Sequence, residues 1–156
     1  MKSTNLTLQQ VLVSDRVFVL DQPEKSAVLN RLCEVLATAP EVTDVETLRK
    51  AIFAREELMS TGIGMGIGVP HVRIPSVKNV VMAVGVSREP IVGYEGLDGG
   101  PVHIVCMIAA YQDQHSDYIR TLANVSHLLK HESVRQALLA AEDEASIYRI
   151  LTEKRN

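Results

Sequence analysis

The side chain best suited to chemistry in this sequence is His71. It follows four alternating glycines and a proline in the segment Arg55–Arg73, which reads REELMSTGIGMGIGVPHVR. Glycine permits backbone conformations and close approaches that other residues do not. Pro70 fixes its own φ and biases Val69 towards an extended conformation, so we expect a stiff strand end that holds one imidazole in a defined place. Because a neutral imidazole is nucleophilic near pH 7, we predict that His71 takes up and passes on a phosphoryl group.

Arg55 and His115 are the predicted supporting residues for this reaction. Phosphoryl transfer requires mainly positioning and charge stabilisation from the protein. The planar guanidinium of Arg55 can pair with phosphate oxygens, and His115 can donate a hydrogen bond to the phosphoryl group or orient the nucleophile. Ser116 is predicted to cap a helix whose N-terminus, beside His115, favours an anion. Arg73, two residues beyond the nucleophile on a predicted strand, is a secondary phosphate ligand.

Other readings of these residues stay open at the level of sequence. The glycines end in Gly68-Val-Pro, which matches neither a dinucleotide-binding loop nor a phosphate-binding loop that ends in Gly-Lys-Ser/Thr. His71 could be a loop histidine without function. A metal-dependent hydrolase that uses His71, His103 and His115 is a weaker alternative, because no acidic ligand stands at a recognisable spacing. We interpret His103 as a core residue, and expect no cofactor or metal.

The elements that must position these residues are predicted from the apolar pattern. Continuous apolar runs of β-type residues predict buried strands, and apolar residues at helical spacing predict amphipathic helices. Capping boxes are predicted at Thr43–Glu46 and Ser133–Gln136. The predicted strands cover residues 17–20, 80–86 and 102–109, and the predicted helices cover about 24–38, 43–55, 116–129, 133–141 and 144–153. This alternation favours an α/β layered domain with a mostly buried sheet, formed by residues 1–156 as one unit.

Composition and charge limit the kinds of partner and the cellular location that we expect for the protein. The 156 residues carry a net charge of −3 and are 46% hydrophobic, as in an ordinary soluble globule. No basic excess supports nucleic-acid binding. The N-terminus lacks an apolar signal region and no apolar run reaches ~18 residues, so we expect a cytoplasmic protein without direct membrane insertion. Cys33 and Cys106 are predicted to be buried free thiols.

With these residues, the sequence resembles the fructose–mannitol-type enzyme IIA domain of the bacterial phosphoenolpyruvate-dependent phosphotransferase system. That group includes the nitrogen-regulatory enzyme IIA. The resemblance covers nearly the whole chain and is specific at Arg55-Glu56, at residues 60–64 (STGIG) and at residues 66–71 (GIGVPH). It departs from the usual family pattern at Gly68, where the family usually has alanine.

The resemblance implies a single mixed sheet between helices and a phosphotransferase component that acts as a carrier. His71 would accept phosphate from the histidine phosphocarrier protein, with His115 and Arg55 in the supporting positions. The phosphoryl group would then pass to a IIB domain in sugar uptake. In the alternative role, a free-standing nitrogen-related regulator, the phosphorylation state of the same histidine would control the binding of a target protein.

Overall fold

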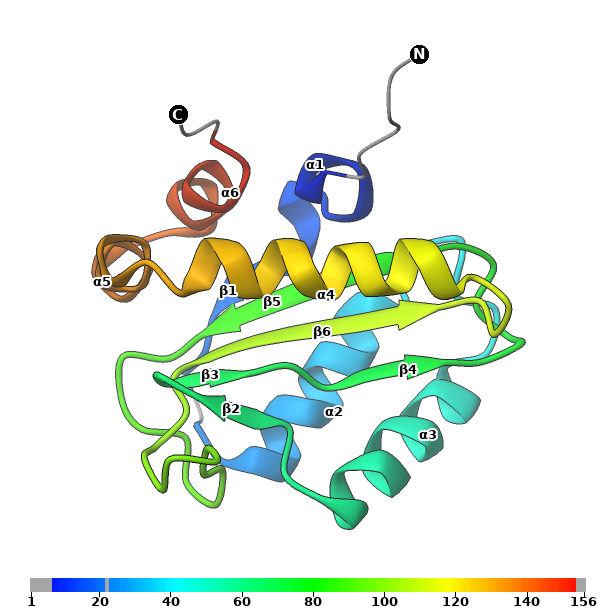
Figure 1. Ribbon diagram of the computed structural model, residues 1–156, viewed down its shortest axis with the longest axis horizontal. Coiled ribbons are helices and arrows are strands. Elements are labelled where there is room, and N and C mark those ends of the chain that lie inside the picture. The colour runs from blue at the N-terminus through cyan, green and yellow to red at the C-terminus, as the bar shows by residue number, and fades with distance from the viewer. Residues whose placement is uncertain (1–6, 22, 154–156) are drawn as a thin grey trace.

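The computed structural model describes residues 7–21 and 23–153 and contains a mixed β-sheet with helices on both faces (Figure 1). The strands are β1 (Val17–Val19), β2 (Gly62–Gly64), β3 (Ile67–Gly68), β4 (His71–Arg73), β5 (Val81–Val86) and β6 (Ile104–Ala110). The helices are α1 (Leu8–Val11), the 3-10 turn η1 (Ser14–Arg16), α2 (Lys25–Leu36), α3 (Val45–Leu58), α4 (His115–Leu129), α5 (Glu132–Ala140) and α6 (Glu144–Thr152). The predicted α/β sandwich is confirmed.

The sheet is organised around β6. Its strand order is β1-β5-β6-β3-β2, with β5 antiparallel to β6 and β1 parallel to β5. Strands β3 and β4 both run parallel to β6, where they pair with successive stretches of its sequence. They are separated by Val69 and Pro70, and Pro70 has no N–H to donate to the ladder. His71 therefore begins a strand directly after a fixed break in the pairing.

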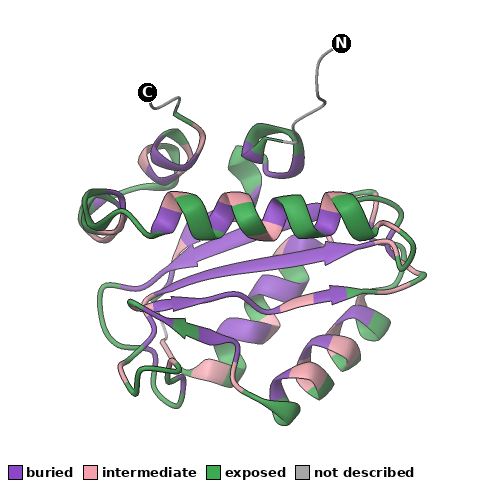
Figure 2. Cartoon of the chain, in the orientation of Figure 1, coloured by how far each residue is buried: buried purple, intermediate pink, exposed green. Residues whose placement is uncertain are grey.

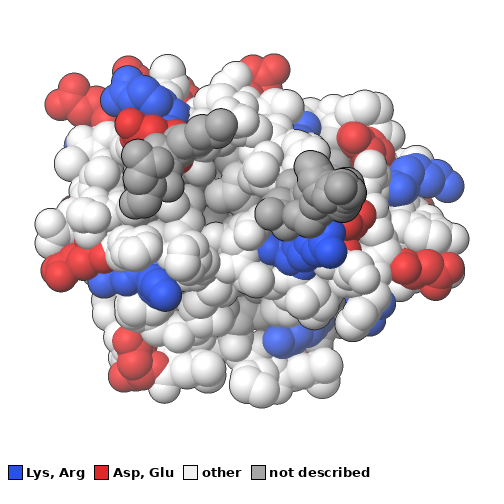
Figure 3. All heavy atoms as spheres, turned by 45° about the horizontal axis from the view of Figure 1, so that its top comes forward, with Lys and Arg blue, Asp and Glu red and all other residues white. Residues whose placement is uncertain are grey.

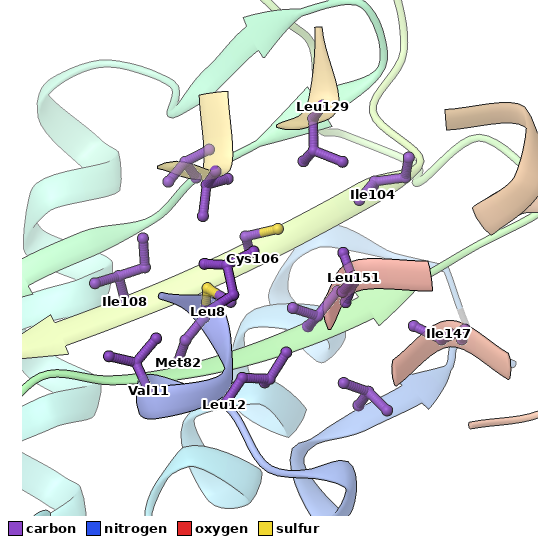
Figure 4. Close-up of a cluster of buried hydrophobic side chains, with 14 of the residues drawn as sticks. Leu8, Val11, Leu12, Met82, Ile104, Cys106, Ile108, Leu129, Ile147 and Leu151 are labelled. Atoms are coloured by element: carbon purple, nitrogen blue, oxygen red, sulfur yellow. The ribbon is translucent and has the colours of Figure 1, made fainter. Parts of the chain in front are cut away.

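Both faces of the sheet are covered, which explains why its central strands are apolar along their whole length. Helices α2 and α3 pack on one face, and α4 and α6 pack on the other (Figure 1). Every residue of β5 and β6 is buried, whereas the helices carry buried and exposed stripes (Figure 2). Alternate side chains of β5 and β6 enter two separate hydrophobic clusters, and Figure 4 shows the cluster under α1, α4 and α6.

Three predicted helix starts are wrong by one or two residues. The observed N-cap residues of α3, α4 and α5 are Asp44, Gln114 and His131. Thr43 instead donates its hydroxyl to the carbonyl of Ser76, at 2.7 Å, while the Asp44 carboxylate accepts from the first turn of α3. Ser116 and Ser133 each lie one residue inside the helix that they were predicted to cap. At α3, two side chains that can cap stand next to one another, and the contact of Thr43 with Ser76 leaves the cap to Asp44. Neither Gln114 nor His131 makes a capping side-chain hydrogen bond to the backbone of the helix that it precedes.

The surface carries mixed charge. On the face shown in Figure 3, lysine and arginine side chains are interspersed with aspartate and glutamate among a majority of uncharged residues. Within the described residues, none of the helices combines the length and the apolar character needed to span a bilayer.

Candidate functional site

The glycine-rich segment forms a short hairpin that leads into the predicted nucleophile. Strands β2 and β3 pair antiparallel with an irregular register, and the turn between them has positive φ at Gly64 (104°), Met65 (58°) and Gly66 (79°). The Asp98 side chain steadies this turn by accepting from the Met65 amide at 3.2 Å. Positive φ is accessible to glycine without steric cost, so two of the four glycines are explained by the turn itself.

His71 is held by its own strand. Its Nδ1 lies 2.6 Å from the carbonyl oxygen of Val69, and its side chain is half-buried. A carbonyl oxygen can only accept, so Nδ1 carries the proton, and in the neutral imidazole Nε2 keeps the lone pair. The backbone on either side is fixed as well, because Val69 donates to Thr61 at 2.9 Å and Pro70 accepts from Ile108 at 3.0 Å. The imidazole is therefore set in the tautomer whose Nε2 can act as a nucleophile.

An open pocket of about 480 Å³ lies at this imidazole. It brings together His71 and Arg55, which were predicted to act together, and Arg73, the secondary candidate for binding phosphate. Its lining consists of Ala51, Arg55, His71, Val72, Arg73, Ile74, Gln112 and Tyr118. Two guanidinium groups thus border the cavity that contains the nucleophile, and such groups attract and orient phosphate oxygens.

Both arginines are tethered by backbone carbonyl groups. Arg55 lies in the last turn of α3 and donates from Nη1 to the carbonyl of Met59 at 3.1 Å. Arg73 donates from Nη1 to the carbonyl of Gln112 at 3.0 Å. A guanidinium has five N–H donors, so each keeps donors for a ligand after making this bond. Neither has an acidic partner within salt-bridge distance among the described residues.

His115 lies apart from this pocket lining. It is the first residue of α4 and is exposed, and Gln114 precedes it as the N-cap. One helical turn later, Tyr118 lines the pocket and its ring centroid lies 5.7 Å from that of His71. The structure thus brings Arg55 and His71 together and places His115 on the helix that borders their pocket.

A buried polar network underlies the hairpin. Glu56 accepts from the Thr61 hydroxyl at 2.6 Å and the Thr61 amide at 2.9 Å, and pairs with Lys25 at 2.8 Å. The Tyr94 hydroxyl lies 2.5 Å from the Thr61 hydroxyl, and Lys25 stands over the Tyr94 ring. Burial alone would raise the pKa of Glu56, but hydrogen bonds from Lys25 and Thr61 outweigh burial and lower it. The Glu56 carboxylate is therefore a charged anchor for α2, α3 and the hairpin.

Sequence reasoning missed Tyr118, Gln112 and this network. Glu56 offered one signal, since it follows Arg55 directly and stands five residues before Thr61. Tyr118 offered another, because it lies three residues after His115 and shares a helix face with it. Neither signal reveals which side chains meet, because this depends on how α3, which carries Glu56, and α4, which carries Tyr118, are rotated against the sheet.

The remaining histidines lie outside the pocket lining. His103 precedes β6, is half-buried, and its Nδ1 lies 3.0 Å from the Ser87 carbonyl oxygen. His127 and His131 are exposed, with their rings 5.7 Å apart and nearly perpendicular. Across residues 7–21 and 23–153, no three His, Cys, Asp or Glu side chains are grouped so that they could hold a metal ion.

The arrangement of sheet and helices is that of an enzyme IIA. A chain of the Escherichia coli complex of enzyme IIAMTL and phosphorylated enzyme IIBMTL superposes with a TM-score of 0.76. The match covers 92% of this chain and 100% of that chain at 21% identity. At this identity the likeness defines the fold.

The sequence defines the family. Residues 10–154 match the family described as phosphoenolpyruvate-dependent sugar phosphotransferase system, EIIA 2, and the chain belongs to this family. The fructose-specific EIIABC component of Bacillus subtilis (strain 168) is 39% identical over 134 residues, which make up 86% of this chain and 21% of that protein. A nitrogen regulatory protein of Pseudomonas aeruginosa (strain PAO1) is 27% identical over 152 residues, or 97% of this chain and 98% of its own length.

Proposed function

We propose that this protein carries a phosphoryl group on Nε2 of His71, accepting it from the histidine phosphocarrier protein and passing it to a IIB component. One observation supports this most directly. The Nδ1–H of His71 is bound to the Val69 carbonyl, so the free lone pair resides on Nε2 in a pocket that two arginines also line. Membership of the EIIA 2 family supports the same reaction.

The proposed transfer is a direct displacement. Nε2 of His71 attacks the phosphorus of the donor phosphohistidine, whose ring is protonated on its other nitrogen. An N–P bond forms on His71, and the N–P bond to the donor breaks as the donor ring leaves as neutral imidazole. Acceptance needs no proton loss from His71, because Nε2 already has a lone pair. The product keeps Nδ1–H, so its imidazole is cationic and is a good leaving group for the second transfer. The same displacement, with a IIB nucleophile, discharges the protein.

Arg55 and Arg73 have electrostatic roles in this proposal. Charge in phosphoryl transfer is spread over the equatorial oxygens, and fixed cations lower the barrier by stabilising it there. His115 contributes at the N-terminus of α4, where its ring can donate to the phosphoryl group once a donor protein covers the site. Its exposed position fits a residue that acts in the complex.

Two physiological roles are consistent with this chemistry. The fructose-specific relative and the mannitol enzyme, solved with its phosphorylated IIB, support transfer to a IIB acceptor in sugar uptake. The nitrogen regulatory relative, which this chain matches over nearly its full length, supports a regulator instead. The phosphoryl group carries about two negative charges on its exposed oxygens, enough to create or disrupt charge-assisted contacts with a target protein.

The decisive experiment supplies enzyme I, the histidine phosphocarrier protein and labelled phosphoenolpyruvate. We expect acid-labile label on the wild-type protein and none on His71→Ala. His127→Ala is the matched control, since it removes an exposed histidine away from the pocket, and it should label at the wild-type rate. Equal labelling of the His71→Ala variant would contradict the proposal. Adding a panel of IIB domains then separates the two roles, because only an uptake component loses its label to one of them.

A further inference from the structure

Tyr118 takes no direct part in the proposed displacement, although its ring contacts two of the residues involved. Its ring centroid lies 5.7 Å from that of His71, with the ring planes inclined at 50°. The guanidinium carbon of Arg73 stands 5.4 Å from the same ring centroid. Tyr118 is buried, whereas Arg73 is exposed and His71 is half-buried. One ring therefore supports both side chains from beneath.

The backbone explains why one ring can reach both. His71 and Arg73 are two residues apart on β4, so they project from the same face of the strand. Val72, between them, enters the hydrophobic cluster beneath α2 and α3, whereas Tyr118 belongs to the cluster on the α4 side. The face of β4 that carries the imidazole and the guanidinium is thus the face that meets Tyr118, in the first turn of α4.

Both contacts of the Tyr118 ring are energetically attractive. Tilted ring pairs at this separation are attractive, and a guanidinium is attracted to the face of an aromatic ring. Burial raises the pKa of Tyr118, and the nearby positive charges of Arg73 and Arg55 offset this only in part. The phenol therefore stays neutral at physiological pH and adds no negative charge that would repel an incoming phosphoryl group.

We propose that Tyr118 is a positioning residue for phosphoryl transfer, which fixes the imidazole plane of His71 and places the Arg73 guanidinium beside it. The inference rests on the proposed function of His71. Two restraints then define the imidazole: the hydrogen bond from Nδ1–H to Val69 and the packing of the ring on Tyr118. Rotation of the imidazole about its Cβ–Cγ bond breaks both. With both in place, Nε2 is oriented before the donor protein arrives.

The test compares Tyr118→Leu with Tyr118→Phe, and uses Tyr148→Leu as the matched control. Tyr148 is half-buried and packs against the same hydrophobic cluster, on α6. We expect Tyr118→Leu to lower the maximal rate of phosphoryl acceptance by about 10- to 100-fold, because small misplacements of a nucleophile have effects of this size. The concentration of phosphocarrier protein giving half-maximal rate should change little. Tyr118→Phe keeps the ring and should remain within about three-fold of wild type.

A second readout reports on the imidazole without any reaction. Nitrogen-15 NMR of the His71 ring should show the Nδ1–H tautomer in wild type, Tyr118→Phe and Tyr148→Leu. In Tyr118→Leu the two tautomers should mix, and the carbon-bound ring protons should lose the ring-current shift of Tyr118. Should the leucine variant unfold, Tyr118→Met replaces it, since methionine has a flexible apolar side chain without an aromatic ring.

The outcomes separate this inference from the function on which it rests. If wild type accepts phosphate and the ring-less variant matches it in rate and imidazole spectrum, Tyr118 does not position His71. If Tyr118→Phe is as slow as Tyr118→Leu, the hydroxyl is the essential group and the inference is also wrong. If wild type accepts no phosphate, the proposed function fails, and the imidazole spectra still decide whether Tyr118 orients the ring.

Discussion

At Gly68, two residues before the proline that precedes the nucleophile, the space for a side chain is already occupied. A Cβ built there would lie 2.6 Å from the hydroxyl oxygen of Tyr94 and 2.7 Å from the ring carbon that bears it. The Tyr94 hydroxyl is held in turn by Thr61, which is bound to Glu56. The tyrosine therefore cannot move away without breaking the buried network. Here glycine is required by close packing, and the Cβ of an alanine would not fit.

Gly68→Ala should accordingly destabilise the protein by about 1–3 kcal/mol, the usual cost of overpacking a filled site. Urea unfolding measures the change. Gly100→Ala is the matched control, since its nearest contact would be an ordinary 3.4 Å. In a Tyr94→Leu background the alanine substitution should cost much less, because the clashing group is gone. Equal costs in the two backgrounds would show that Tyr94 is not the cause.

The pairing of His71 with Arg55 could be predicted from sequence, whereas the pairing with Tyr118 could not. The first two residues are joined by a short segment, in which Pro70 fixes its own φ and restricts Val69. Tyr118 is 47 positions beyond His71, and its contact depends on the rotation of α4, which is set by several buried residues at once. His115 shows the same dependence, because the exact start of the helix decides where that imidazole points.

At the scale of the elements, Glu56 joins α3 to α2 through Lys25 and to the β2 strand through Thr61. Its pKa in the folded protein is below the usual value of 4.5. A carboxyl group with a lowered folded pKa stabilises the protein above its unfolded pKa, and this stabilisation is lost as pH falls through the folded pKa. The connection between these elements should therefore weaken in acid.

We expect Glu56→Gln to lower the free energy of unfolding by about 1–3 kcal/mol at neutral pH, as for other buried hydrogen bonds to charged groups. The deficit relative to wild type should be constant between about pH 6 and pH 8 and should shrink below pH 4.5, where the unfolded wild-type chain takes up its proton first. Urea unfolding across this range measures it. Glu57→Gln, at the exposed neighbouring position, is the control, and its free energy of unfolding should match that of wild type across this pH range. A deficit that stays the same below pH 4.5 would contradict the role of Glu56 as a charged, stabilising carboxylate.

The elements themselves were largely predictable, because strands β5 and β6 are continuous apolar runs and the helices show one buried stripe each. What sequence could not resolve was their exact ends. At α3, Thr43 and Asp44 can both cap, and the choice falls to Asp44 because Thr43 is occupied by the loop at Ser76. The hairpin was also predicted only as a strand end, since its turn depends on the support of Asp98 from a distant loop.

At the scale of the whole molecule, the sheet separates two hydrophobic clusters, and each contains one cysteine. Cys33 lies in the cluster beneath α2 and α3, and Cys106 lies in the cluster on the α4 side. Both thiols are free and buried, and burial raises the pKa of each to about 12. Because the thiolate is the reactive form, neither should react until the protein opens.

The two clusters share the strands β5 and β6, whose side chains alternate between them, so neither face can lose its packing while the other keeps its own. We therefore predict that both thiols become accessible in a single global unfolding event. In the single-thiol variants Cys106→Ala and Cys33→Ala, labelling by a thiol reagent at about pH 8 should be at least about 10³-fold slower than in urea, as expected for a stability of 5 kcal/mol or more. For each variant, the labelling rate gives the free energy needed to expose its thiol, and this value should equal the free energy of unfolding of the same variant. Comparing the two values within one variant removes the small effect of the substitution itself. A thiol that labels with a much smaller free energy would show that its face of the sheet opens separately, and the shared strands would then not couple the two cores.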